Sequence, residues 1–452
     1  MDTKLPIAVI GAGPVGLAAA AHLLARGLRP LVLEAGAGPG ASIERRAHVR
    51  MFSPWQFNVD SEAVRLLAAE GWRLPPAEAY PSGRELLDHY LRPLAEVPGL
   101  KPHVHFNTRV VAVSRAGRDV MKTQGREAAP FLLRVVGPEG ERDVLASALI
   151  DASGTYRTPN CLGGHGIPAL GENALAERIA YGIPAVLHEA RQRYANRRVL
   201  VVGSGHSAFN VLQDLVQLAQ QAPSTRIFWA IRGTSLARIL GGGANDQLQA
   251  RGQLGQRIGE LLREGAIELL QNVAVDRIVE SAEGLRLGSG EQVLPSVDEV
   301  IVATGFRPDL SLLGELRLAL DPATQSPVQL APLIDPNEHS CGTVRPHGAL
   351  QLAHPEGNVY VVGMKSYGRA PTFLLMTGYE QVRSVAAALA GDWEAAGRVE
   401  LVLPETGVCS TQLREADCCD RVANPRCCAP SCCTEPATTA DAGAEVRRSG
   451  CQ

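Results

Sequence analysis

Two glycine clusters in this chain have the spacing of a turn that binds phosphate groups. The first, Gly11-x-Gly13-x-x-Gly16, follows the apolar run Ile7–Ile10 and begins an Ala- and Leu-rich helical segment. In such a turn the first glycine permits the bend, the second lets the backbone approach a pyrophosphate, and the third lets the helix lie close to the strand. Glu34 ends the next apolar run, where a carboxylate accepts hydrogen bonds from ribose hydroxyls. The pattern predicts a dinucleotide site; the alternative is a glycine-rich helix start that binds nothing.

The second cluster, Gly203-x-Gly205-x-x-Ala208, has alanine at the third position, which the motif tolerates. The strand Arg198–Val202 precedes it, and the next strand ends at Arg232 rather than at an acid. A guanidinium at this position suits the 2′-phosphate of NADP, because charge-assisted hydrogen bonds to phosphate are strong. An ordinary surface arginine is the alternative. Two clusters predict two dinucleotides in one chain.

Three more strands are expected to end in turns of small residues, where the backbone can approach a cofactor closely. These turns are Asp151–Gly154, Ala303–Gly305 and Gly363–Ser366. The strand Val359–Val362 before the last turn and the helix Phe373–Ala390 after it repeat the pattern of the first domain. We therefore expect an α/β fold with two Rossmann-like dinucleotide-binding domains, the second inserted in the first.

Periodicity predicts the elements between these motifs. Ser61–Glu70 and Gly83–Leu94 are amphipathic and predict helices. His103–Val113 alternates in the manner of a strand, and Phe131–Val136 is expected to form a hairpin with Val144–Ile150.

Two long segments are predicted to be loops. Leu240–Gly255 is polar, glycine-rich and too long for a simple connection, which favours a functional loop. Gly36–Asn58 contains Arg45, Arg46 and Trp55, which could cover a flavin beside the pyrophosphate. A surface loop with a buried tryptophan fits the same residue types equally well.

The composition limits the classes of function. The chain has 452 residues, more than one hydrophobic core usually serves, so we expect two domains and a tail. A net charge of −3 gives no electrostatic case for nucleic acid or an anionic membrane. No apolar run reaches the roughly 18 residues of a membrane-spanning helix, and glycines interrupt the N-terminal apolar stretch. We expect a cytoplasmic protein without a signal peptide; its oligomeric state is unknown.

Eight of the ten cysteines lie between Cys409 and Cys451, in a segment whose composition cannot bury a core. A disulfide framework is expected in small secreted domains rather than at one end of a large cytosolic chain. We therefore interpret the segment as a Cys-rich tail without a fold, whose thiols capture a metalloid or are incidental. The candidate capture residues are Cys409, Cys418, Cys419, Cys427, Cys428, Cys432 and Cys433.

The motifs resemble those of two-dinucleotide flavoproteins and, among them, of flavin-containing monooxygenases. The resemblance covers about residues 5–400 and rests on IGAGPVG, ASGTYRTP, VVGSGHSA and ATGFRPD. FSPW, YPSGRELLDHYL, GMKSYGRAPTFL and the Cys-rich end are similar to flavoproteins encoded in arsenic-resistance operons. With the patterning, this predicts an FAD-binding domain in residues 1–160, an NADPH-binding domain in 161–340, a return segment of the FAD domain in 341–404, and the tail in 405–452.

The resemblance also implies which residues hold FAD and NADPH. Those implied for FAD are Gly11, Gly13, Gly16, Glu34, Gly363, Met364, Lys365 and Ser366. Those implied for NADPH are Gly203, Ser204, Gly205, Ser207, Ala208 and Arg232. Further candidates for cofactor binding are Pro14, Val15, Ala35, Arg45, Phe52, Ser53, Trp55, Asn58, Val110, Gly154, His206, Thr304 and Gly305.

Two departures from the family pattern matter for function. The Phe-x-Gly-x-x-x-His fingerprint of Baeyer–Villiger and related flavin monooxygenases is missing, since Tyr181, Gly182 and His188 have the wrong spacing. This argues against ketone oxygenation. Gly363-Met364 replaces the usual Gly-Asp of the second flavin motif, so the ribityl hydroxyls need another partner, for which Lys365 and Ser366 are candidates.

The predicted activity is NADPH- and FAD-dependent monooxygenation of a soft nucleophile, with O2 as co-substrate. Trivalent arsenic, inorganic or methylated, has the lone pair that would take an oxygen atom, and soft thiolates bind soft centres. Cys341 is a candidate capture residue; an ordinary buried thiol is the alternative. The tail cysteines could be catalytic or auxiliary. Three alternative functions remain open. The first is an NADPH-dependent flavin reductase of metals or disulfides that uses the C-terminal Cys pairs. The others are an N- or S-hydroxylating monooxygenase and a metalloid-sequestering protein.

Overall fold

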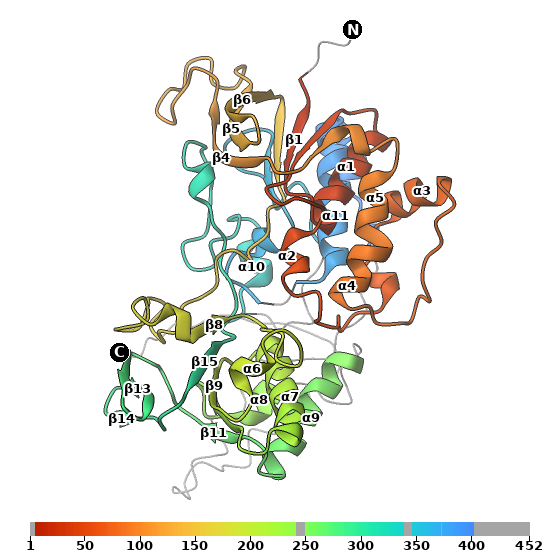
Figure 1. Ribbon diagram of the computed structural model, residues 1–452. Helices are drawn as coiled ribbons and strands as arrows, with labels where there is room; N and C mark the ends of the chain where they lie inside the picture. Colours follow the sequence, from red (N-terminus) through yellow and green to blue (C-terminus); the bar gives the residue numbers. More distant parts are fainter. Residues whose placement is uncertain (1–4, 241–248, 339–345, 372, 402–452) are drawn as a thin grey trace, which may run out of the picture. The chain divides into compact units, whose positions relative to one another are not determined.

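The computed structural model describes residues 5–240, 249–338, 346–371 and 373–401. Its first sheet is parallel, with the strand order β16-β7-β1-β2-β3. Figure 1 labels its strand β1 and the helix α1 that follows. Segments far apart in the sequence meet in this sheet, because β16 pairs with β7. The strands are Ile7–Ile10 (β1), Pro30–Leu33 (β2), Val104–His105 (β3), Ala148–Asp151 (β7) and Val359–Val361 (β16).

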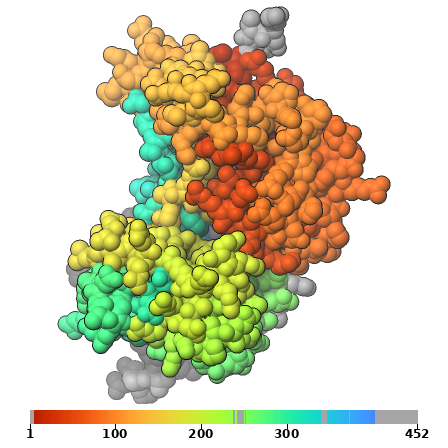
Figure 2. Space-filling view, in the orientation of Figure 1, coloured from red at the N-terminus to blue at the C-terminus, as the bar shows by residue number. Residues whose placement is uncertain are grey.

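Both faces of the first sheet are covered, so its central strands are continuous apolar runs. Ile7 and Val9 pack against helices on one face, whereas Ala8 and Ile10 pack against a second, antiparallel sheet on the other. The outer side of that antiparallel sheet faces solvent, and Val136 there is 42% exposed (Figure 2). The covering elements are the helices α1 (Pro14–Ala25), α3 (Ser61–Ala69) and α11 (Leu375–Leu389) and the strands β4 (Arg109–Arg115), β5 (Phe131–Gly137) and β6 (Gly140–Ala146).

A second parallel sheet repeats this arrangement, with the order β11-β10-β9-β15-β8. Val199 and Val201 pack against α7 and α9, and Leu200 and Val202 pack against a small antiparallel sheet. Its parts are β8 (Ile179–Tyr181), β9 (Arg198–Val202), β10 (Arg226–Ala230), β11 (Glu268–Leu270), β15 (Glu299–Val302), α7 (His206–Gln221), α9 (Gln249–Arg263), β12 (Arg277–Ser281), β13 (Gly284–Ser289) and β14 (Gln292–Val293). The structure confirms the predicted α/β fold with two Rossmann-like units. The exact domain limits stay a prediction.

Short helices complete the described chain. They are α2 (Ala41–Glu44), α4 (Gly83–Leu86), α5 (Arg92–Glu96), α6 (Arg191–Tyr194), α8 (Leu236–Leu240), α10 (Ala331–Ile334) and α12 (Trp393–Gly397). The predicted helix Gly83–Leu94 is helical throughout, although a π-helical turn, Leu87–Leu91, separates α4 from α5. Within the described residues, no helix is long and apolar enough to cross a bilayer.

Three boundary predictions were wrong. The apolar segment Val144–Ile150 does not form one hairpin strand, because it divides at Ser147 between β6 and β7, which belong to different sheets. His103–Val113 is likewise two strands, separated by Asn107 in the left-handed region with φ +52°. In the predicted loop Leu240–Gly255, the part from Gln249 onward is helix α9; residues 241–248 lie outside the described residues.

Candidate functional site

The first glycine turn, Gly11–Gly16, connects β1 to α1 at the carboxyl edge of the first sheet. Gly11 has φ +99°, and a Cβ there would lie 2.9 Å from the carbonyl oxygen of Ala152. A Cβ on Gly16 would lie 2.0 Å from the carbonyl oxygen of Gly11, so strand and helix are in close contact. At Gly13, in contrast, a Cβ would meet no atom within 4 Å. The turn is therefore closed by its first and third glycines and open at its second, as a bound pyrophosphate requires.

The start of α1 at this turn favours an anionic ligand. Gly13 is the N-cap of α1, so the first backbone N–H groups of a 12-residue helix lack intrahelical partners there. Pro14 occupies the first helical position, where it removes a donor that would have had no partner.

Glu34 lies directly after β2, beside the first glycine turn. Its carboxylate accepts the backbone N–H of Ala12 at 2.8 Å and that of Gly36 at 2.7 Å, and the residue is 8% exposed. A carboxylate has about four acceptor positions. Two therefore remain for ribose hydroxyls, and the side chain is already held in place by the backbone.

Basic residues lie near Glu34, and of these the sequence analysis selected Arg45 but not Arg109 or Arg157. Arg157 lies close enough to Glu34, Arg109 and Arg45 to interact electrostatically with their charges. Burial is the main cause that lowers the pKa of Arg157, and the Arg109 charge lowers it further. These arginines come from separate segments, so their proximity had no signal in the sequence. They place positive charge beside a site predicted to hold a pyrophosphate.

The second glycine turn, Gly203–Ala208, connects β9 to α7 in the same way. Gly203 has φ +134°, and a Cβ there would lie 2.4 Å from the carbonyl oxygen of Ala303. A Cβ on Gly205 would again meet nothing within 4 Å. Trp229, a fully buried residue of β10, donates its indole N–H to the carbonyl oxygen of Gly203 at 2.7 Å and fixes the turn. This turn also has the open second glycine that a pyrophosphate needs.

Arg232 follows β10 at the same sheet edge, next to the strand that leads into the second glycine turn. Its guanidinium is exposed, and Nη1 lies 3.5 Å from the carbonyl oxygen of Gly164. This long contact leaves most of its donors available. The position agrees with a role at the 2′-phosphate of NADPH.

In the loop Gly36–Asn58, most of the selected polar side chains stabilise the loop itself. Asn58 is 0% exposed, and its amide donates to the carbonyl oxygens of Ser53 and Pro54 at 2.7 and 2.9 Å. Trp55 is 4% exposed and belongs to the hydrophobic core. These side chains therefore stabilise the loop and the hydrophobic core rather than contact a ligand. Phe52 differs, because its ring lies 5.4 Å from the ring of His206 at the start of α7.

A second set of side-chain contacts links the two units. The guanidinium carbon of Arg46 lies 3.7 Å from the centre of the Tyr156 ring, and Tyr156 meets Phe306 edge-on at 4.9 Å. Asn160 bonds to the backbone of the predicted Thr304–Gly305 turn, since its amide donates to the carbonyl oxygen of Thr304 at 2.9 Å. Sequence reasoning missed these aromatic residues and Asn160, which come from segments far apart in the chain.

The return segment begins with a short helical turn, Gly363–Tyr367. The backbone N–H of Gly363 donates to Oε1 of Gln381 at 2.7 Å, so it is not available to a cofactor. Lys365 and Ser366 are 1% and 0% exposed, which also argues against direct contact with a cofactor. Met364 is the partly exposed residue of this group. The prediction that the side chains of Lys365 and Ser366 replace the missing aspartate directly is therefore wrong.

The remaining predictions fall on other parts of the chain. Val110 is in β4 and is 8% exposed. Cys341 and all seven candidate capture cysteines lie outside the described residues. Cys161, the cysteine that the structure does describe, is a free thiol of intermediate exposure. No group of His, Cys, Asp or Glu in the described ranges is arranged to hold a metal ion.

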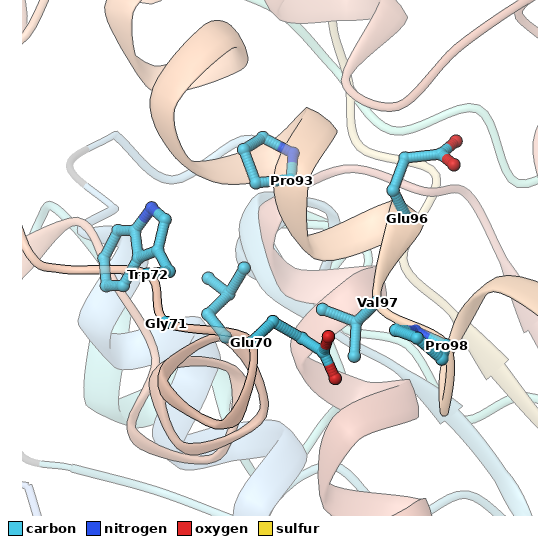
Figure 3. Close-up of a pocket in the computed structure, with 8 residues that line it drawn as sticks. Glu70, Gly71, Trp72, Pro93, Glu96, Val97 and Pro98 are labelled. Carbon is cyan, nitrogen blue, oxygen red and sulfur yellow. The ribbon is translucent and has the colours of Figure 1, made fainter.

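One surface hollow lies away from both glycine turns. It has a volume of about 470 Å³ and lies between the end of α3 and the end of α5 (Figure 3). Trp72, Pro93 and Val97 line it, with the carboxylates of Glu70 and Glu96 at its edge. It shares no residue with the predicted cofactor sites, so we exclude it from the candidate site.

Comparison with known proteins now identifies the family. The family model described as pyridine nucleotide-disulphide oxidoreductase matches residues 8–332. The chain belongs to this family. Membership confirms the predicted enzyme class, an oxidoreductase, and its use of a pyridine nucleotide. No curated protein sequence matches the chain.

Solved structures of other proteins have the same fold as this chain. Bacillithiol disulfide reductase from Bacillus cereus is 20% identical, with a TM-score of 0.63, over 86% of this chain and 99% of that one. A double mutant of the flavin monooxygenase from Stenotrophomonas maltophilia is 22% identical, with a TM-score of 0.56, over 86% and 99%. The FAD-bound cadaverine monooxygenase from Erwinia amylovora is 15% identical, with a TM-score of 0.59, over 89% and 99%. At these identities the likeness establishes the fold. FAD and NADPH are the cofactors that fit the two glycine turns.

Proposed function

We propose that the protein is an NADPH- and FAD-dependent monooxygenase that oxidises a trivalent arsenical, methylarsenite or arsenite, to the pentavalent form. FAD, when bound, supplies hydride acceptance from NADPH and activation of O2. The overall reaction balances: arsenic gains one oxygen atom of O2 and loses two electrons, NADPH gives two electrons, and the second oxygen atom leaves as water with two protons.

The two open glycine turns, joined by the contact of Phe52 with His206, carry this proposal. Phe52 comes from the loop Gly36–Asn58, which follows β2, and His206 begins the helix of the second turn. This contact supports two nucleotide sites that lie near each other, as transfer of a hydride between their ligands requires. Glu34 would bind the adenosine ribose of FAD, and Arg232 would bind the 2′-phosphate of NADPH.

The residue types at these turns favour oxygen transfer over thiol chemistry. A flavin reductase of disulfides needs a thiol pair against the flavin. No cysteine occurs in the first glycine turn, in the loop Gly36–Asn58 or in the second glycine turn. The reductase remains the second candidate, because the family description names disulphides and one solved structure of this fold is a disulfide reductase.

The arsenical substrate rests on the sequence. Adjacent thiols such as Cys418 and Cys419 can each give a sulfur ligand to As(III), a soft centre. The narrower resemblance to flavoproteins of arsenic-resistance operons points the same way. An N- or S-hydroxylating monooxygenase would share the cofactor sites and differ in its substrate.

The deciding experiment measures NADPH oxidation and O2 uptake with arsenite, methylarsenite, thiols, disulfides and amines. We expect stimulation by a trivalent arsenical, one O2 consumed per NADPH, and a pentavalent product. Oxidation of NADPH that needs a disulfide and proceeds without O2 would establish the reductase instead. Binding of arsenical without any NADPH consumption would leave only sequestration.

A further inference from the structure

A buried ion pair joins the turn after β7 to the return segment. Lys365 Nζ lies 2.7 Å from Oδ2 of Asp151, the last residue of β7, and both side chains are 0% exposed. Since neither side chain reaches the surface, neither touches a molecule that binds at the sheet edge. An ion pair in such a place is costly unless its remaining hydrogen-bonding positions are satisfied.

Ser153 supplies the additional hydrogen bonds. Its Oγ donates to Oδ1 of Asp151 at 2.6 Å and accepts from Lys365 Nζ at 3.0 Å. Its backbone N–H also donates to Oδ1 of Asp151, at 3.0 Å. A hydroxyl has one donor hydrogen and two acceptor positions. The hydrogen of Ser153 is therefore committed to Asp151, and one acceptor position remains.

The turn that carries this acceptor borders open space. Ser153 is partly exposed, unlike Lys365 and Asp151. The next residue, Gly154, has φ +73°, and a Cβ there would meet no atom within 4 Å. The turn thus offers a fixed oxygen atom that can accept a hydrogen bond but has no hydrogen to give.

The sheet order places this oxygen on the flavin side of the predicted FAD site. Ligands of such sheets bind outside the carboxyl ends of the strands, at the point where the strand order reverses. That point lies between β1 and β7, because β2 and β3 follow on one side and β7 and β16 on the other. Glu34, which follows β2, lies at the predicted position of the adenosine half of FAD. The other half of the dinucleotide extends across the end of β7, towards Ser153.

We propose that Ser153 Oγ accepts a hydrogen bond from a ribityl hydroxyl of FAD and that Lys365 and Asp151 are positioning residues that hold it. This inference rests on the proposed FAD site and deepens it. A ribityl hydroxyl donates one hydrogen and needs an acceptor. The aspartate usual after the glycine of the second flavin motif is Met364 here, which has no oxygen to offer. Ser153 supplies the acceptor from the neighbouring strand.

The first test compares FAD with ADP, which lacks the ribityl chain, as ligands of apoprotein. Ser153→Ala should weaken FAD binding roughly 2- to 13-fold, the effect of one net hydrogen bond, and leave ADP binding unchanged. Ser281→Ala is the matched control, because its hydroxyl donates to the carbonyl oxygen of Gly284 in a hairpin away from the site. It should leave the affinity for both ligands unchanged.

The second test separates positioning from direct contact. Replacing both charges, in Lys365→Met with Asp151→Asn, avoids leaving one buried charge without a partner. This double variant should weaken FAD binding by a similar factor, again without effect on ADP. Adding Ser153→Ala to it should cause little further loss, because the same contact is removed twice.

Equal affinity of wild type and Ser153→Ala for FAD would overturn the inference, as would an equal loss for FAD and ADP. Full additivity of Ser153→Ala with the double variant would refute the positioning role of Lys365 and Asp151. None of these measurements uses O2 or an arsenical, so they separate this inference from the proposed reaction. Wild-type protein that binds no FAD would contradict the proposed function itself.

Discussion

At the residue scale, buried carboxylates hold the turns on which the candidate site depends. Glu34 binds two backbone N–H groups, and Asp151 binds Lys365 and Ser153. Glu172 does the same in the second unit, where it is 2% exposed and accepts the backbone N–H of Leu162 at 2.7 Å. Hydrogen bonds to a charged acceptor are about twice as strong as neutral ones, so these carboxylates fix loop backbone efficiently.

The role of Arg232 can be tested at this scale. Arg232→Ala should raise the KM for NADPH roughly 10- to 150-fold, because a lost charge-assisted contact costs about 1.5–3 kcal/mol. The KM for NADH, which lacks the 2′-phosphate, should change little. Arg226→Ala is a suitable control, since Arg226 is exposed at the opposite end of β10. Equal effects on both nucleotides would show that Arg232 does not bind the phosphate.

Asp214 on α7 should make the free energy of unfolding depend on pH. Burial raises the pKa of its carboxyl to about 6, and the nearby His188 charge opposes this only in part. The folded state therefore holds a proton that the unfolded state has lost between about pH 4 and pH 6, so stability falls as pH rises through that range.

Asp214→Asn removes this ionisation. The variant should be more stable than wild type at pH 7.5 by about 2–3 kcal/mol, and the two should be equal near pH 4. Urea unfolding at both pH values measures the difference. Asp298→Asn should have the opposite sign at pH 7.5, because hydrogen bonds from Arg198 lower the pKa of Asp298. A variant no more stable than wild type at pH 7.5 would contradict the assignment.

At the element scale, each glycine turn is completed by a neighbouring strand. Gly11 lies against Ala152 after β7, and Gly203 lies against Ala303 after β15. Both partner strands pair directly with the strand that precedes the glycine turn. Gly11 and Gly203 are thus needed for close approach of backbone to backbone, whether or not a cofactor is bound.

Two glycines of the first turn, Gly13 and Gly16, should respond differently to substitution. Gly13→Val should fold normally but contain no FAD, because its Cβ meets open space that the pyrophosphate would fill. Gly16→Val should unfold at much lower temperature, since its Cβ would lie 2.0 Å from the carbonyl oxygen of Gly11. Flavin absorbance per protein and thermal unfolding measure the two effects. Folded Gly13→Val protein with full flavin content would refute the FAD site.

At the scale of the whole molecule, the chain contains two units with the same architecture. The residue that follows the second strand of the glycine motif differs between the two units. Glu34 follows β2 and Arg232 follows β10. A carboxylate accepts hydrogen bonds from ribose hydroxyls, whereas a guanidinium attracts a phosphate. The same fold can therefore hold two different dinucleotides, and side-chain contacts such as Phe52 with His206 connect the units.

Removal of the Cys-rich tail tests whether substrate capture and chemistry are separate. Truncation after Thr411 should leave FAD content and basal NADPH oxidation unchanged, while the affinity for a trivalent arsenical decreases. Cys341→Ser should lower turnover more than truncation does, if that thiol holds the reacting arsenic. Arsenical-stimulated NADPH oxidation of both variants beside wild type provides the measurement. If both keep wild-type turnover and apparent affinity, neither group of thiols captures the substrate.

The sequence by itself determined the features that depend on local spacing. Both glycine turns, the strands and helices that flank them, and the choice of Glu34 and Arg232 follow from periodicity over about 30 residues. The α/β fold with two Rossmann-like units followed from the same signals, because a buried parallel strand is a continuous apolar run. Such signals are local, so they can be recognised in a single amino-acid sequence.

Only the tertiary structure decided which side chains meet across the sheet edge. Lys365 was expected to contact the ribityl chain, yet it is buried against Asp151, more than 200 residues earlier in the chain. The interest of Ser153 and Arg157 likewise depends on contacts with residues far away in the sequence, which only the folded chain shows. The segment Val144–Ile150 was divided between two sheets for a similar reason: one apolar run fits either sheet, and only the partners available in the folded chain choose between them.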